Sequence, residues 1–178
     1  MKQTKSGSVV LMANSITAEE RIKAVQQKLD EYEGRCGLPP AMAPGTDIEL
    51  NGYLTMDKIS ILSLSVEDCA AIAYRLAQFS FYITRLYNTE RSNQLWAEAI
   101  LRELLADVKD NYGQYTKHEL KFALLAKENA FAQKVHDMVK HANHRIQRLT
   151  GLSEGINFLS KVLMDVRRSK YTKETSYG

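Results

Sequence analysis

The sequence has few of the residues that interrupt helices or cross-link small domains. Among 178 residues it contains three prolines, nine glycines and two cysteines, Cys36 and Cys69. Because proline and glycine are the strongest helix breakers, their scarcity favours long helices. Two isolated cysteines supply neither a disulfide framework nor thiolates at metal-ligand spacing. We interpret them as reduced thiols in an intracellular protein, since disulfides belong mainly to secreted proteins.

Long apolar runs and enzyme motifs are also missing. No run of about 18 apolar residues occurs, so no segment is expected to span a membrane. The apolar letters VVLMA near the start are too few for a secretory signal. The phosphate-loop pattern GxxxxGKS/T, the esterase pattern GxSxG and the metalloprotease pattern HExxH are all absent. We therefore predict a non-enzymatic protein with no metal, no cofactor and no membrane partner.

The hydrophobic pattern that is present predicts a mostly α protein. Beyond Ser65, apolar side chains from Ile72 to Val108 recur at a spacing close to 3.5, which is typical of a coiled-coil seam. Polar Glu90 and Asn93 fall on this seam. Either the helix breaks there, or these two residues fix the register between paired helices, and we favour the unbroken helix.

A second apolar stripe predicts that the chain returns along this first helix. After a turn at Gly113, the stripe runs from Phe122 to Leu149, and the pattern resumes from Ile156 before a polar tail. The expected fold is therefore a long antiparallel helical hairpin, or coiled coil. We divide the chain into a flexible N-terminus (1–14), an N-terminal arm (15–64), the helical hairpin (65–169) and a polar tail (170–178).

The N-terminal arm is predicted to combine a helix, a linker and a small β-hairpin. Thr17 and Glu20 have the spacing of a capping box at the start of an amphipathic helix. A proline-containing linker follows over residues 38–47. Asn51-Gly52 then stands between two short alternating arms, and Asn-Gly is the strongest short signal for a hairpin turn.

Charge is unevenly distributed along the chain. The formal net charge is only +3, yet residues 134–173 contain nine Lys and Arg against three Asp and Glu. A basic segment of this kind favours a polyanionic partner, because phosphate groups are held mainly by Lys and Arg. The alternative is an ordinary solvated helix surface.

Three of the four histidines lie in residues 133–151, QKVHDMVKHANHRIQRLTG. On a helix, His136 and His141 point to opposite flanks, so they cannot share one metal ion. One flank beside the apolar stripe instead carries Lys134, Arg145 and Arg148. Guanidinium groups on a rigid helix suit phosphate contacts and can also stack on bases. We hypothesise that this flank, rather than the histidines, forms a binding surface.

The chain resembles the phage recombination mediators of the UvsY family over residues 65 to about 168. The resemblance lies in AAIAYRLAQFSFYITRLYNTERSNQLWAEAILRELLADVKDNYG and in KVHDMVKHANHRIQRLTGLSEGINFL. The first segment is similar to the family's long first helix with its tyrosine-glycine turn. The second is similar to the returning helix, which precedes a last short helix. The N-terminal 64 residues lie outside the resemblance.

The resemblance implies a homo-oligomeric ring that binds single-stranded DNA in the host cytoplasm. It also implies two protein partners, a RecA-type recombinase and the single-strand-binding protein that covers the DNA. The family carries basic residues at the end of its first long helix, where only Lys109 and Arg102 match and Asp107 and Asp110 intrude. This departure shifts the expected contacts towards the basic last third. The predicted DNA-binding residues are Lys134, Arg145, Arg148, Lys161, Arg167, Arg168, Lys170, Lys109 and Arg102.

Two other functions compete with the DNA-binding interpretation. A structural subunit of a virion ring, neck or scaffold would use the same long seam for protein contacts and would be found in the virion. The small subunit of a phage DNA-packaging enzyme would need a compact helix-turn-helix, but Pro39, Pro40 and Pro44 stand where its second helix should be. Tyr82, Tyr112 and Tyr115 are further candidates, for stacking with bases.

Overall fold

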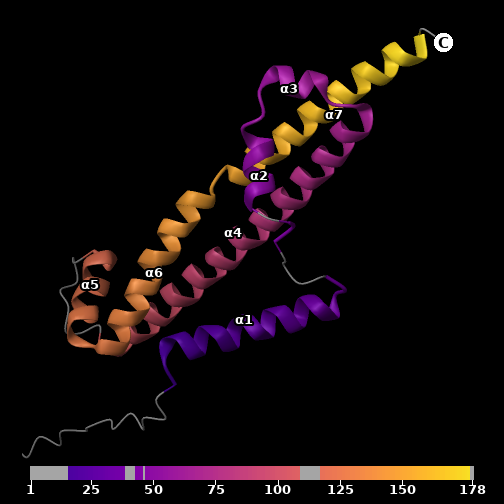
Figure 1. Ribbon diagram of the computed structural model, residues 1–178. Helices are drawn as coiled ribbons and strands as arrows, with labels where there is room; N and C mark the ends of the chain where they lie inside the picture. Colours follow the sequence, from indigo (N-terminus) through magenta and orange to yellow (C-terminus); the bar gives the residue numbers. More distant parts are fainter. Residues whose placement is uncertain (1–15, 39–42, 46, 109–116, 177–178) are drawn as a thin grey trace, which may run out of the picture.

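The computed structural model describes residues 16–38, 43–45, 47–108 and 117–176, and all the regular elements among them are helices. No helix in this part of the chain has the length and apolar character that a membrane crossing requires. Figure 1 shows the arrangement. The helices are α1 (Ala18–Arg35), α2 (Asp47–Leu54), α3 (Lys58–Ser63), α4 (Val66–Val108), α5 (His118–Glu128), α6 (Ala130–Leu149) and α7 (Leu152–Ser176).

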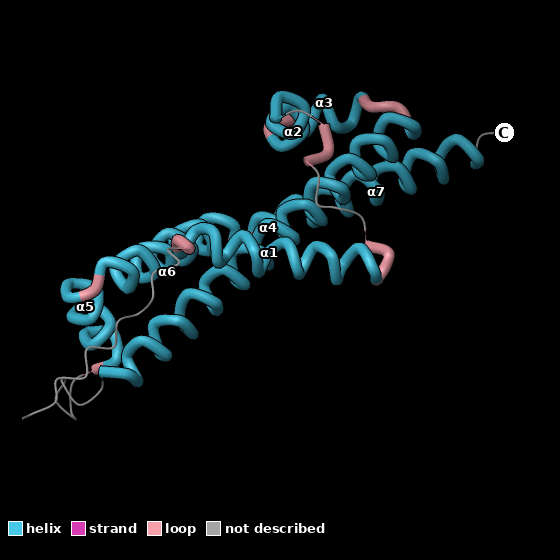
Figure 2. The backbone as a smooth tube through the Cα atoms, turned by 90° about the horizontal axis from the view of Figure 1, so that it is seen from below, coloured by secondary structure: helices cyan, strands magenta, loops and turns pink. Residues whose placement is uncertain are grey.

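Helix α4 is the axis of the molecule, and α6 and α7 return along it in the opposite direction (Figures 1 and 2). It runs unbroken for 43 residues, which confirms the predicted long helix. The Ser65 hydroxyl accepts a hydrogen bond from the Asp68 amide at 2.9 Å and caps its start. The predicted antiparallel helical hairpin is therefore present.

Hydroxyl groups tie α7 directly to the backbone of α4. The Ser80 hydroxyl donates to the Ser153 carbonyl oxygen at 2.9 Å, and the Ser153 hydroxyl donates to the Ser80 carbonyl oxygen at 3.0 Å. Seven residues away on each helix, the Ser160 hydroxyl donates to the Ala73 carbonyl oxygen at 2.8 Å. Such contacts require closely spaced helices, which the small side chains at these positions permit. They fix the antiparallel register.

The hydrophobic core consists of two clusters along this hairpin. Each lies where α4 is covered by the returning chain and by part of the N-terminal arm. The first contains Ala18 of α1 with Ala97, Leu101, Leu105, Leu125, Ala132 and Val135. The second contains Ala73, Leu76, Phe79, Ile156 and Leu163, with Leu50 and Tyr53 of α2 packed against it.

The predicted β-hairpin at Asn51-Gly52 is wrong, because these residues lie inside helix α2. The following segment, at residues 58–63, is helix α3. A two-stranded ribbon is marginally stable alone and needs a further surface to pack on. As a helix, the segment places Leu50 and Tyr53, three residues apart, against the second core cluster. This burial outweighs the local turn preference of Asn-Gly.

The returning chain was predicted to be helical from Phe122 to Leu149 and to resume at Ile156, but it is divided at one further place, Asn129. Asn129 has an extended backbone, and its side chain accepts hydrogen bonds from the amides of Phe131 and Ala132 at 2.9 and 3.1 Å. It thereby caps α6, while α5 folds back beside it (Figure 1). Gly151, with a φ of 78°, separates α6 from α7. Helix α7 then continues to Ser176, into the residues assigned to a polar tail.

Helix α1 lies against α4 through apolar contacts at its start and polar contacts further along. The predicted Thr17–Glu20 capping box is present. Ala18 and Ile22 are buried, whereas further along α1 the amide of Gln26 donates to the Asn93 side-chain oxygen at 2.7 Å. Asn93 therefore positions α1 rather than the second arm of the hairpin.

Replacement by alanine should have opposite effects at two glycines near the start of α7. Gly151 has a left-handed backbone, so Gly151→Ala should lower the free energy of unfolding by roughly 1 to 2 kcal/mol. Gly155 lies within α7, and an added methyl group meets nothing within 4 Å. Gly155→Ala should raise the free energy of unfolding by about 0.5 to 1 kcal/mol. Urea unfolding measures both free energies. An unchanged free energy of unfolding in Gly151→Ala would contradict the left-handed backbone at Gly151.

Candidate nucleic-acid interface

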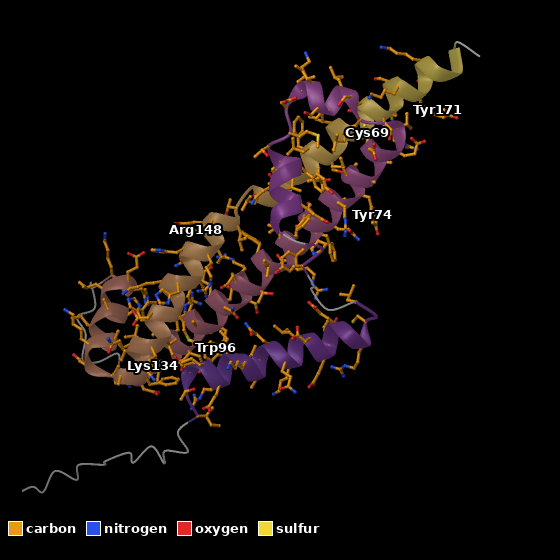
Figure 3. The ribbon with its side chains drawn as sticks, in the orientation of Figure 1. Cys69, Tyr74, Trp96, Lys134, Arg148 and Tyr171 are labelled. Carbon is orange, nitrogen blue, oxygen red and sulfur yellow. The ribbon has the colours of Figure 1, made fainter. Side chains whose placement is uncertain are left out.

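Three of the predicted DNA-binding residues lie on one exposed flank of α6. The buried side of this helix carries Ala132, Val135 and Ala142, which pack towards α4. The flank beside it carries what we call the α6 basic strip, Lys134, Arg145 and Arg148, all exposed. Figure 3 labels Lys134 and Arg148 near the two ends of α6. They are 14 positions apart, or roughly 21 Å along the helix axis.

Arg145 differs from the other two because it is already paired. Its Nε lies 2.7 Å from a carboxylate oxygen of Glu90 on α4, and the two side chains are 51% and 19% exposed. The second carboxylate oxygen of Glu90 is buried and has no hydrogen-bond partner among the described residues. The pair therefore links α6 to α4 and compensates a largely buried carboxylate. Glu90 thus has the register role predicted for a polar residue on the seam.

The four basic residues predicted on α7 divide into two pairs. Lys161 and Arg168, seven residues apart, are exposed on the same side of the helix, and Arg168 lies 3.6 Å from Asp165. Arg167 and Lys170 instead face the packed side. The Nε of Arg167 is buried, and the ammonium group of Lys170 donates to the carbonyl oxygens of Leu62, at 2.6 Å, and Leu64. Lys170 thus fixes the end of α3 against α7.

The predicted residues at the end of α4 add little to this surface. Arg102 is exposed and pairs with Glu98 of its own helix at 3.1 Å. Lys109 lies outside the described residues, as do Tyr112 and Tyr115. Tyr82 is half-buried on α4. Among the predicted DNA-binding residues that are described, all the exposed ones except Arg102 therefore lie on α6 and α7.

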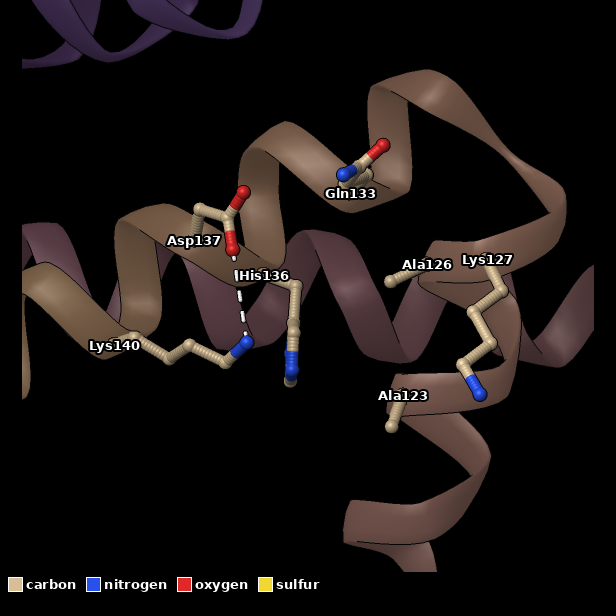
Figure 4. Close-up of a pocket in the computed structure, with 7 residues that line it drawn as sticks. All are labelled: Ala123, Ala126, Lys127, Gln133, His136, Asp137 and Lys140. Carbon is tan, nitrogen blue, oxygen red and sulfur yellow. Dashed lines mark ion pairs between the residues drawn. The ribbon is translucent and has the colours of Figure 1, made fainter.

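A hollow that the sequence did not reveal lies on the other flank of α6, where α5 folds back beside it. Its volume is about 440 Å³, and Figure 4 shows His136, Lys127 and Lys140 around it, with Lys140 paired to Asp137 at 3.6 Å. Burial lowers the pKa of His136, the charge of Lys140 lowers it further, and Asp137 opposes the shift. The hollow exists because the chain breaks at Asn129, and no pattern in the sequence identified that break.

The histidines do not form a metal site with other ligands in the part of the chain that is described. No group of three His, Cys, Asp or Glu side chains lies close enough to hold an ion there. Cys36 is exposed and Cys69 is buried in the hairpin, and both thiols are free.

Comparison with known proteins adds no family to this picture. No protein-family model matches the chain, and neither a curated protein nor a solved structure matches it. The resemblance to the UvsY family therefore stays a prediction from the residues.

The lowered pKa of His136 predicts a loss of stability in mild acid. The unfolded chain takes up a proton near pH 6.5, but the folded chain takes it up only at lower pH. The free energy of unfolding should therefore fall as the pH drops below 6.5. Urea unfolding over this range should show a smaller fall for His136→Gln. The exposed His141→Gln serves as the control, and equal slopes in both variants would contradict the assignment.

Proposed function

We propose that this protein binds single-stranded DNA through the α6 basic strip and acts, as an oligomer, as a recombination accessory of a phage. The observation that carries the proposal is the exposure of Lys134 and Arg148 on one flank of a rigid helix. Neither side chain has an ion-pair partner among the described residues. Free, fixed cations are what phosphate groups bind.

The contacts of the other basic residues support this choice of strip. Arg102, Arg145 and Lys170 are each tied to another group of the protein. Binding DNA through them would require those contacts to be shared or broken, whereas Lys134, Arg148 and Lys161 are exposed without such a cost. Lys134 and Arg148 are therefore the primary phosphate ligands, and Lys161 with Arg168 extends the surface onto α7.

The recombination role rests on the resemblance to the UvsY family. What supports it in this chain is the succession of a long helix, a basic helix and a further helix, α4, α6 and α7, although α7 with 25 residues is longer than the short last helix that the resemblance implies. Binding through phosphates on one strand is tolerant of base sequence, which suits a protein that acts along any single strand. Its expected partners are the recombinase and the single-strand-binding protein.

A structural subunit of a virion assembly is the second candidate. The observation that favours it is the exposure of large apolar side chains on α4, among them Tyr74, Phe81 and Leu95. Exposed apolar patches mark protein contact sites. In that case the basic strip meets acidic groups of a neighbouring protein, and the purified protein carries no nucleic acid.

Removing both free cations of the α6 strip predicts weaker and less salt-sensitive DNA binding. Each phosphate contact on a single strand contributes about 0.7 to the slope of log affinity against log salt. The double variant Lys134→Ala/Arg148→Ala should therefore reduce the magnitude of the salt slope by about 1.4. At about 0.1 M salt, its affinity for DNA should be on the order of tenfold lower. Fluorescence anisotropy with a labelled oligonucleotide measures both quantities.

The matched control is Lys23→Ala/Lys28→Ala, which removes the same charge from exposed positions of α1. It should leave the salt slope unchanged. Arg145 is kept intact, because its loss leaves Glu90 unpaired and confuses folding with binding. Equal slopes for the double variant and the wild type, or no binding by the wild type at low salt, would refute the proposed function.

A further inference from the structure

A row of exposed residues on α4 repeats every seven positions. Tyr74, Phe81 and Leu95 are 66%, 57% and 52% exposed, and Asn88 is exposed between them. Arg102, seven positions after Leu95, is exposed as well. We call Tyr74, Phe81, Asn88, Leu95 and Arg102 the α4 stripe. Such a row supplies one of the two apolar positions per heptad by which paired helices pack, and Tyr74, Phe81 and Leu95 are its large members.

The stripe is separate from the contacts that build the hairpin. The side of α4 that faces α6 and α7 carries Leu76, Phe79 and Leu101, all buried. Helix α1 is joined to another side, through Asn93 and through the ion pair of Arg85 with Glu33. Figure 3 labels Tyr74 on the outer edge of α4, away from α7. None of the described helices covers this row.

The stripe is symmetric about Asn88. Phe81 and Leu95 lie seven positions before and after it, and Tyr74 and Arg102 lie fourteen positions before and after it. An antiparallel pairing about a two-fold axis exchanges exactly these halves, since each subunit presents the same patch to the other. Equal spacing gives any such row this symmetry, and the chemistry of the exchanged positions makes the stripe self-complementary: Phe81 changes places with Leu95, and the Tyr74 ring changes places with the Arg102 guanidinium.

We propose that α4 pairs antiparallel with α4 of a second copy of this chain, with the two-fold axis passing close to Asn88. Phe81 then packs near Leu95 of the second copy. Tyr74 lies near the guanidinium of Arg102 of the second copy, a favourable cation–π pairing. Asn88 lies near Asn88 of the second copy, and a buried Asn pair fixes the register of helix pairs.

Smaller residues beside the stripe are arranged with the same symmetry. Ala77 and Ala99 are both exposed and lie at equal distances from Asn88. They allow the two helices to approach closely on either side of the axis. Arg85 and Arg91 also occupy mirror positions and repel each other across the axis, but Arg85 is compensated by Glu33. The apolar contacts of three large residues per copy, Tyr74, Phe81 and Leu95, therefore outweigh this repulsion in the free energy of pairing.

Cysteine cross-linking tests the position of the axis in the full-length protein. Cys36 is exposed and is first replaced by Ser, whereas Cys69 is buried and can stay. Asn88→Cys in this background should then give a covalent dimer with a short bis-maleimide. The control, Lys161→Cys on the exposed side of α7, should give none.

The orientation of the pair is tested at the ends of the stripe. Tyr74 and Arg102 are roughly 42 Å apart along α4. A mixture of Tyr74→Cys and Arg102→Cys proteins should therefore cross-link, while each alone should not. Self-linking of Tyr74→Cys would indicate a parallel pair and overturn the proposal, as would failure of Asn88→Cys to link.

Replacing the apolar pair tests the energetics without disturbing the fold. Phe81→Ser/Leu95→Ser changes only exposed side chains, and circular dichroism verifies that the helices remain. Light scattering should show a rise in the dimer dissociation constant on the order of 100-fold. An unchanged dissociation constant, or a wild type that is monomeric throughout, refutes the pairing. The inference does not rest on DNA binding, whose salt slope is measured separately on α6 variants.

Discussion

The close contact between α4 and α7 determines how the rest of the molecule is arranged. Ser80 and Ser153 each donate a hydrogen bond to the other's backbone carbonyl, and Ser160 does the same to Ala73 one heptad away. A buried hydroxyl that loses its acceptor leaves an unpaired polar group, so a shift of register has a high cost. The register in turn determines which sides of α4, α6 and α7 face outwards.

The ion pair between Arg145 and Glu90 shows how one residue can satisfy two patterns in a sequence. By its position, Arg145 belongs to the basic strip on α6. By its contact, it compensates a largely buried carboxylate on α4 and continues the antiparallel register set by the serines. Breaking a partly buried pair leaves a charge in a poorly solvated place. We therefore regard Arg145 as a structural residue first, and its part in the proposed phosphate binding as secondary.

The long-range architecture could be predicted from the sequence because it depends on periodicity. The apolar spacing along α4 and the scarcity of helix breakers were sufficient for the hairpin. The β-hairpin prediction was wrong because a local preference competed with burial. Asn51-Gly52 favours a turn, but a helix buries Leu50 and Tyr53 against the second core cluster. The break at Asn129 and the hollow beside it depend on how α5 folds back, which no periodic pattern records.

Basic residues could be identified from the sequence, but the sequence could not show which of them are free to contact a ligand. Lys170 and Lys134 look equivalent in the sequence. In the structure, Lys170 donates to two carbonyl oxygens at the end of α3, while Lys134 is exposed on α6. The proposed DNA surface lies on α6 and α7, and the proposed pairing surface lies on a different side of α4. The primary residues of the two proposals lie on different helices, so pairing through Phe81 and Leu95 of α4 does not use Lys134 or Arg148 of α6. A dimer then presents two such strips, and a single strand that reaches both gains affinity through effective concentration rather than through new contacts.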